Sequence, residues 1–414
     1  MSNAYAIPPI VQKIIIASIS VTAFFLPIRE FPKLLFLLIF LASSFYIQIR
    51  KKIWHEYDVF DYLLLAWVCS GFITASFSPF EYKEWRGAVS NVYIPFTLLF
   101  IKYTNFNSKK ILLILGSVLV GTLVATTEGF WQLANNHATT LMLHSVGHVN
   151  HSAIYLCMSF SVAISFCLTL TRKAPLKFFL SLVALLIIIV STIYTDSRGS
   201  AITMFIIGVT SSFFWARKSK KPFLIVVISL FIIASSLFYW KAPIIEKTLH
   251  QTSKGHLIPA RLKIWNSSLL IWRHNPILGI GIKNYGEASG KIQRQWLAEE
   301  NRQFSDEFMP YVHAHSLYFS ILAEQGILGA GIIFFVLLKI AFSLFGNIPK
   351  FEDSNFTWLL WLSAFGSLQV VLINGLVNTT LRMEHGLLFA IITGLWLSFN
   401  RSISNTSQSD SYQA

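Results

Sequence analysis

Charged residues are scarce in this chain of 414 residues, at 13% of the total, whereas hydrophobic residues make up 54%. Soluble domains usually carry about 25% charged residues, so the composition excludes an ordinary soluble protein. Apolar runs close to 20 residues long recur from end to end, and each could cross a hydrocarbon core of about 30 Å. We therefore predict a polytopic membrane protein.

Cysteine is also rare, and the three present (Cys69, Cys157 and Cys167) all lie inside apolar runs. Cysteine in such surroundings is most simply a small apolar residue. We expect neither a disulfide nor a cysteine-based metal site. The first apolar run lacks a basic start and a small-residue cleavage site, so we also expect no cleavable signal peptide.

The apolar runs predict about twelve membrane-spanning helices. The backbone must satisfy its own hydrogen bonds in lipid, and the runs lack the alternation of barrel strands. The tenth run is too long for one straight span, and Gly326 and Gly329 predict a break in it. The predicted spans are approximately 9–28, 33–49, 59–78, 87–102, 111–130, 151–170, 176–195, 199–215, 222–240, 316–345, 356–375 and 385–400.

Lysine and arginine gather in the loops that follow even-numbered spans, such as "RKK" at 50–52. By the positive-inside rule this face is cytoplasmic, with both termini inside. The net charge of +14 thus reflects membrane orientation, and we expect no nucleic-acid partner.

The predicted domain organisation has four parts. Residues 1–240 hold nine spans, 241–315 form a basic helical loop on the outer face, 316–400 hold three spans, and 401–414 form a disordered cytoplasmic tail. The loop is too long to be structureless. Its apolar spacing predicts one helix from Leu262 to Trp272 and a second over about 284–301.

Polar residues of the outer face cluster in "GHVNHSA" (147–153), "TDSRGS" (195–200), "ARLKIW" (260–265) and "HAHS" (313–316). All four lie at a membrane boundary on the same side, so we expect them to surround one site. Arg198 lies between two closely spaced spans, where arginine is costly and tends to be functional. Arg261 opens the predicted loop helix. Two guanidinium groups at one membrane boundary suit a phosphate-bearing lipid.

His315 begins the tenth span and His313 precedes it by two residues, a poor helical spacing for joint metal ligation. We expect no metal site. A neutral imidazole can accept a proton near pH 7, so His315 is the candidate general base, with anchoring of the span as the alternative. We expect Glu324 to pair with an arginine. Further candidate substrate-binding residues are His313, Arg86, His148, Asn150, His151 and Arg382.

The segments "TDSRGSAI", "ARLKIWNSSLLIWRHNPILGIGIKNY" and "HAHSLYFSILAEQGILGAG" follow one another as in the O-antigen ligase family, which the chain resembles from about residue 145 to 331. The resemblance implies an all-α, GT-C-like glycosyltransferase of the Gram-negative inner membrane. Its two family arginines match Arg198 and Arg261, and its histidine matches His315. Ser316 stands where the family usually has asparagine.

The resemblance further implies metal-independent, inverting transfer, without a cofactor, of a glycan from undecaprenyl diphosphate to a sugar hydroxyl of lipid A-core. The expected partners are this donor, this acceptor and membrane lipids, and we expect a monomer. O-antigen polymerases and protein O-oligosaccharyltransferases share the fold and part of the motifs, so the acceptor stays open. The sequence is also compatible with a secondary transporter or with an inactive glycan-binding or scaffold protein, although paired halves typical of transporters are not evident.

Overall fold

Helices make up the regular structure of the described residues, 8–80, 84–170, 174–219 and 260–411, in this computed structural model. The α-helices are α1 (Pro9–Phe25), α2 (Glu30–Lys51), α3 (Val59–Ser76), α4 (Glu84–Lys102), α5 (Ser108–Ala134), α6 (Val149–Thr169), α7 (Pro175–Tyr194), α8 (Arg198–Ala216), α11 (Ala260–His274), α12 (Gly290–Glu299), α13 (Leu317–Gly346), α14 (Asn355–Gln369) and α15 (Met383–Ser411). Short turns of helix are η2 (Ile53–Glu56), η3 (Tyr285–Glu287) and the π-helical η4 (Val370–Asn374), which continues α14.

Nine helices within the described ranges are long and apolar enough to cross a membrane: α2, α3, α5, α6, α7, α8, α13, α14 with η4, and α15. Helices α1 and α4 also form where spans are predicted, but α1 has 17 residues and α4 carries a proline, Pro95, in its interior. The predicted span 222–240 and loop residues 241–259 lie outside the described residues. The chain is an all-α, polytopic membrane protein.

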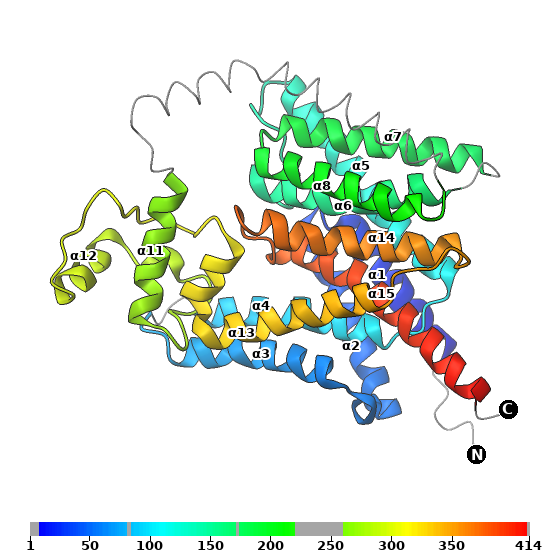
Figure 1. Cartoon of the computed structure of the whole chain (residues 1–414), viewed down its shortest axis with the longest axis horizontal. Coiled ribbons are helices and arrows are strands. Elements are labelled where there is room, and N and C mark those ends of the chain that lie inside the picture. Colours follow the sequence, from blue (N-terminus) through cyan, green and yellow to red (C-terminus); the bar gives the residue numbers. More distant parts are fainter. Residues whose placement is uncertain (1–7, 81–83, 171–173, 220–259, 412–414) are drawn as a thin grey trace.

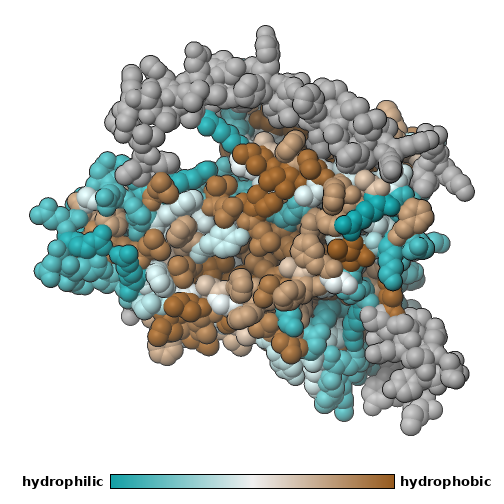
Figure 2. Space-filling view, viewed as in Figure 1, coloured by the Kyte–Doolittle hydropathy of each residue, from teal (hydrophilic) through white to brown (hydrophobic). Residues whose placement is uncertain are grey.

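Helix α6 lies at the centre of the bundle, where it packs against α7, α8, α14 and α15. Nearly all of its side chains are buried, including Tyr155 and Phe160. By contrast, α7 exposes Phe179, Leu186 and Val190. Figure 2 shows hydrophobic side chains across the middle of the molecule and hydrophilic ones over α11 and α12. An apolar belt between polar ends is expected of a protein that faces lipid.

The segment 260–299 forms two helices, α11 and α12, that lie together at one end of the bundle beside the start of α13 (Figure 1). Both helices were predicted within this loop. A small core of its own, formed by Ile264, Ile271, Ile280 and Tyr285 with Ala323 of α13, fixes α11 to α13. Helix α15 continues to Ser411, through most of the segment predicted as a disordered tail.

The predicted break in the tenth span lies at Gly326, where φ is 60° and ψ is −162° inside α13. The break leaves the carbonyls of Ala323 and Glu324 without their helical partners, the N–H groups four residues on. The loop that precedes α13 supplies hydrogen-bond donors to both carbonyls: Ile280 N–H donates to Ala323 O at 3.0 Å, and Gly281 N–H donates to Glu324 O at 2.9 Å.

The two amides freed by the break are satisfied by the same loop. Ile327 N–H donates to Pro276 O at 2.9 Å, and Leu328 N–H donates to Ile277 O at 3.1 Å. We call residues 276–281 with 323–328 the loop–helix clamp. A Cβ at Gly279 would overlap the backbone of Glu324, and one at Gly326 would overlap the Ile277 carbonyl. The clamp satisfies backbone groups that would be costly to bury unpaired, and it attaches the loop firmly to α13.

Candidate functional site

The starts of several helices meet at the α11 end of the bundle. Arg198 is the first residue of α8, and Arg261 lies in the first turn of α11. Arg198 and Arg261 lie close enough for their positive charges to interact. The charges of Arg261, His148 and Arg382 likewise act on the imidazole of His315. We call Arg198, Arg261, His148, His151, His313, His315 and Arg382 the basic cluster. The structure therefore brings the four predicted polar segments into one place.

Trp265 explains how α11 places Arg261 near His315. Residues four apart lie on one face of a helix, so Arg261 and Trp265 share a face of α11. The Trp265 indole N–H donates to the carbonyl of Ala314 at 3.1 Å, and its ring stacks on Phe319 with 5.0 Å between centroids. Trp265 thus holds the chain between the two histidines beside the turn that carries Arg261.

His315 does not lie on a helix, because α13 begins only at Leu317 with Ser316 as its N-cap. The φ of His315 is 49°, a left-handed conformation that is uncommon outside glycine and asparagine. The rings of His313 and His315 are 4.2 Å apart, and Tyr311 lies 5.2 Å from His315. The helical spacing applied to His313 and His315 from the sequence is therefore wrong. It assumed helical geometry, whereas the left-handed turn brings both imidazoles to one side.

Burial and positive neighbours favour neutral imidazoles in this pair. Burial, followed by the charge of Arg261, lowers the pKa of His315 below its usual value. Burial and the neighbouring His315 lower the pKa of His313 to about 4. Burial and then Arg198 lower the pKa of the Arg261 guanidinium, which nevertheless stays charged at any relevant pH. The arrangement combines fixed cations with proton-accepting imidazoles.

The other predicted residues differ in their positions. His148 caps α6, since its Nδ1 accepts the Asn150 N–H at 3.1 Å. His151 lies one turn later, with its ring 5.7 Å from that of His148. Arg382 acts electrostatically on His151, His313 and His315. Asn150 is half-buried in the first turn of α6, and Arg86 is exposed near the start of α4, beside the loop that holds Ile282.

Two residues near the cluster were not predicted from the sequence. His385 is fully buried and bonded to His151, and Lys283 lies two residues after the clamp loop 276–281. Burial and the charge of Arg382 lower the pKa of Lys283. The backbone amides of Lys283 and Tyr285 face the Glu324 carboxyl, on which Arg382 also acts. Within the described ranges no ion pair joins Glu324 to an arginine, and the charge of Arg382 acts on its carboxyl only from a greater distance.

Ser316, which stands where the resemblance leads us to expect asparagine, makes a contact that fixes the start of α13. Its hydroxyl donates to the carbonyl of Gly375 at 3.2 Å, and the Leu317 N–H donates to the same oxygen at 2.8 Å. The end of η4 also reaches α8, because the Asn374 amide donates to Ser200 Oγ at 2.9 Å. The residues after α14 therefore hold the starts of α13 and α8 in a fixed relation.

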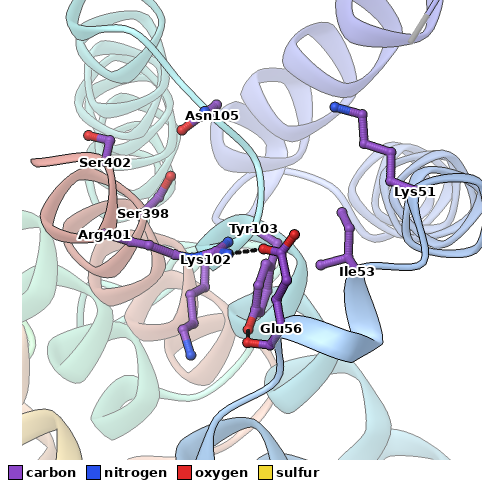
Figure 3. Close-up of a pocket in the computed structure, with 9 residues that line it drawn as sticks. All are labelled: Lys51, Ile53, Glu56, Lys102, Tyr103, Asn105, Ser398, Arg401 and Ser402. Carbon is purple, nitrogen blue, oxygen red and sulfur yellow. Dashed lines mark hydrogen bonds and ion pairs between the residues drawn. The ribbon is translucent and has the colours of Figure 1, made fainter. Parts of the chain in front are cut away.

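A separate polar cavity of about 420 Å³ lies at the other ends of α4 and α15 (Figure 3). Its lining includes Lys51, Glu56 and Arg401, and the last two form an ion pair. Because α4 and α15 begin at the α11 end, this cavity is remote from the basic cluster. Within the described ranges, no group of three His, Cys, Asp or Glu side chains is arranged to hold a metal ion.

Comparison with known proteins bears on the segment that holds the cluster. The family model described as O-antigen ligase matches residues 183–335, which include Arg198, Arg261 and His315. No curated protein matches the chain significantly. The family match supports an O-antigen ligase-like, glycosyltransferase-like activity that uses a lipid-linked glycan in a membrane. It supports the resemblance to the O-antigen ligase family that was read from the sequence of this polytopic membrane protein.

Proposed function

We propose that the chain transfers a glycan from undecaprenyl diphosphate to a sugar hydroxyl of lipid A-core, as an O-antigen ligase. The proposal rests on the electrostatic interaction of Arg261 with both Arg198 and His315, all three of which lie within the matched segment. The transfer needs groups that bind a diphosphate and a group that accepts a hydroxyl proton, and the basic cluster contains both.

The diphosphate binds to Arg198 and Arg261. Guanidinium groups offer paired donors that match phosphate oxygens and keep their charge. Arg198 also begins α8, a helix of 19 residues whose N-terminal amides favour an anion. Negative charge on the diphosphate grows as its bond to the sugar breaks. Fixed cations that meet this charge lower the barrier to transfer.

His315 acts as the general base. The acceptor hydroxyl loses its proton to the imidazole while its oxygen forms a bond to the anomeric carbon. The bond between that carbon and the diphosphate breaks, and the diphosphate leaves with the bonding electrons. A single displacement of this kind inverts the anomeric configuration. A positioned base contributes about 10²–10⁴-fold, and the lowered pKa of His315 keeps it unprotonated at neutral pH.

Transfer by this route needs no metal ion and no nucleotide, since the diphosphate already activates the sugar. The site lies on the periplasmic side of the inner membrane, with both termini cytoplasmic, because Lys and Arg favour the opposite loops. In this orientation the segment 260–315 covers the site from the periplasm. The protein acts as a monomer.

Deletion of the gene followed by gel analysis of lipopolysaccharide tests the function. Loss of the polymer ladder together with accumulation of lipid-linked polymer supports the ligase. A core that carries a single repeat unit would indicate a polymerase instead. An unchanged ladder with unglycosylated pilin would indicate the protein O-oligosaccharyltransferase. Complementation with His315→Asn separates an enzyme from a transporter or scaffold, since only the enzyme needs the imidazole.

A further inference from the structure

A pair of imidazoles borders the basic cluster on the side of α15. His151 Nδ1 lies 3.0 Å from His385 Nε2, and the two rings stack with 5.2 Å between centroids. His385 is fully buried, whereas His151 is partly exposed. Burial of an imidazole is favourable only when its nitrogens find partners, so the hydrogen bonds of this pair decide which nitrogen carries each proton.

The partner of His385 Nδ1 decides which ring nitrogen carries the proton in His385 and, through it, in His151. This nitrogen lies 2.7 Å from the carbonyl oxygen of Thr380, which can only accept. His385 Nδ1 therefore carries a proton, and the more distant Arg382 N–H, at 3.3 Å, makes at most a weak contact with it. In a neutral ring Nε2 is then the acceptor. His151 Nδ1 must donate to it, which leaves Nε2 of His151 with a free lone pair.

The position of His151 along the cluster indicates which substrate it meets. Arg198 acts on Arg261, and Arg261 acts on His315. His151 packs against His148 with 5.7 Å between ring centroids, and the charges that act on it most are those of His385, Arg382, His148 and His313. The groups that act most strongly on His151 are thus histidines and Arg382, and not the arginine pair.

We propose that His151 binds a hydroxyl of the acceptor sugar through Nε2, and that His385 is the positioning residue that fixes its tautomer. The proposal rests on the proposed function, in which the arginine pair holds the donor diphosphate. In an in-line displacement the acceptor hydroxyl attacks the anomeric carbon from the side opposite the diphosphate, and the base contacts that hydroxyl. The acceptor therefore lies on the histidine side of the cluster, away from the arginine pair. His151 is the acceptor-side residue whose free nitrogen the structure defines.

Ring ¹⁵N NMR of the full-length protein, labelled at histidine and held in lipid nanodiscs, tests the tautomer. At pH 7 we expect the resonances that His151→Gln removes to show a protonated Nδ1 and an unprotonated Nε2. His385→Phe removes the acceptor and should shift His151 towards the tautomer protonated at Nε2. His385→Gln can present Oε1 where Nε2 stood and should preserve the wild-type pattern. An Nε2-protonated His151 in the wild type would overturn the proposal.

Steady-state transfer to purified lipid A-core tests the assignment to the acceptor. We expect His151→Leu and His385→Phe each to raise KM for the acceptor by roughly 10-fold, about the loss of one hydrogen bond, with KM for the lipid-linked donor little changed. His385→Gln should recover most of the loss, which a purely structural role of His385 would not predict. Exposed His144, which lies between α5 and α6, provides the control as His144→Phe.

The outcomes separate this inference from the function on which it rests. An unchanged acceptor KM in His151→Leu, with transfer lost in Arg261→Ala, would overturn the inference alone. Full transfer in Arg261→Ala would overturn the proposed donor site. A rise in donor KM in His151→Leu would place His151 on the donor side and also refute the inference. If His385→Phe does not accumulate, His151→Leu and His385→Gln still decide.

Discussion

Substitution of Gly326 by alanine should open the loop–helix clamp. Gly326 has φ 60° and ψ −162°, a region that is essentially restricted to glycine, and a Cβ there would overlap the Ile277 carbonyl. The strained backbone costs about 1–3 kcal/mol. The two hydrogen bonds from Ile327 and Leu328 to the loop are each worth about 0.5–1.5 kcal/mol. We therefore expect the clamp to lose about 2–6 kcal/mol of local stability.

Hydrogen exchange measured by mass spectrometry reports this loss directly. A local loss of 2 kcal/mol corresponds to roughly 30-fold faster exchange, and we expect at least this change at the amides of Ile280, Gly281, Ile327 and Leu328. Gly331→Ala is the matched control, because Gly331 lies in the same helix with open space around its Cα. Alanine there should stabilise α13 by up to about 1 kcal/mol. Equal protection of the clamp in the two variants would refute the reasoning.

Other predictions concern the cluster and its supports. His315→Asn keeps a residue that tolerates the left-handed turn but removes the imidazole, so transfer should fall by about 10²–10⁴-fold. Burial lowers the pKa of His315, so as the pH falls, wild-type kcat/KM should begin to drop only below the ordinary histidine pKa of about 6.5, where His315 gains its proton. A drop that begins above that pH would contradict the role of His315 as the base. Trp265→Phe removes the bond to Ala314 and should lower kcat about 10-fold in the same transfer assay, with unchanged accumulation in the membrane. Lys33 is fully buried and paired with Glu384, so Lys33→Met leaves a carboxylate unpaired and should destabilise the detergent-solubilised protein by about 3–5 kcal/mol. Thermal unfolding of the double variant Lys33→Met with Glu384→Gln should show part of that stability restored. No recovery in the double variant would refute the pairing. Transfer should survive exhaustive chelation, and activity lost in EDTA and restored by one divalent ion would contradict the metal-independent mechanism.

Much of the helical architecture was predictable because lipid restricts the backbone so strongly. A chain that crosses hydrocarbon must bond its own amides, so apolar runs alone predict the helices from α1 to α8 and from α13 to α15. The break at Gly326 was predicted from a run too long for one span. Its pairing with the loop was not, since reciprocal bonds between 276–281 and 323–328 depend on tertiary geometry that spacing does not encode.

The candidate site was predicted in part for the same reason. Arg198, Arg261 and His315 were all predicted at the membrane boundary on the same face. Boundary residues on one face of a membrane protein occupy a thin layer, so we expected these three to lie close together. The relation of His313 to His315 was predicted wrongly, since helical spacing does not apply to the turn before α13. His385 was missed because it lies 234 residues from His151, and only packing shows their contact.

The central claim is that the arginine pair holds the donor diphosphate during transfer. Its most direct test is the rate of transfer from undecaprenyl-diphosphate-linked glycan to lipid A-core by purified Arg261→Ala, compared with Arg273→Ala. Arg273 is an exposed arginine in the last turn of the same helix, α11. The proposed mechanism predicts that Arg261→Ala loses transfer, that Arg261→Lys recovers little of it because lysine lacks the planar fork, and that Arg273→Ala transfers like the wild type. Wild-type rates in Arg261→Ala would contradict the claim.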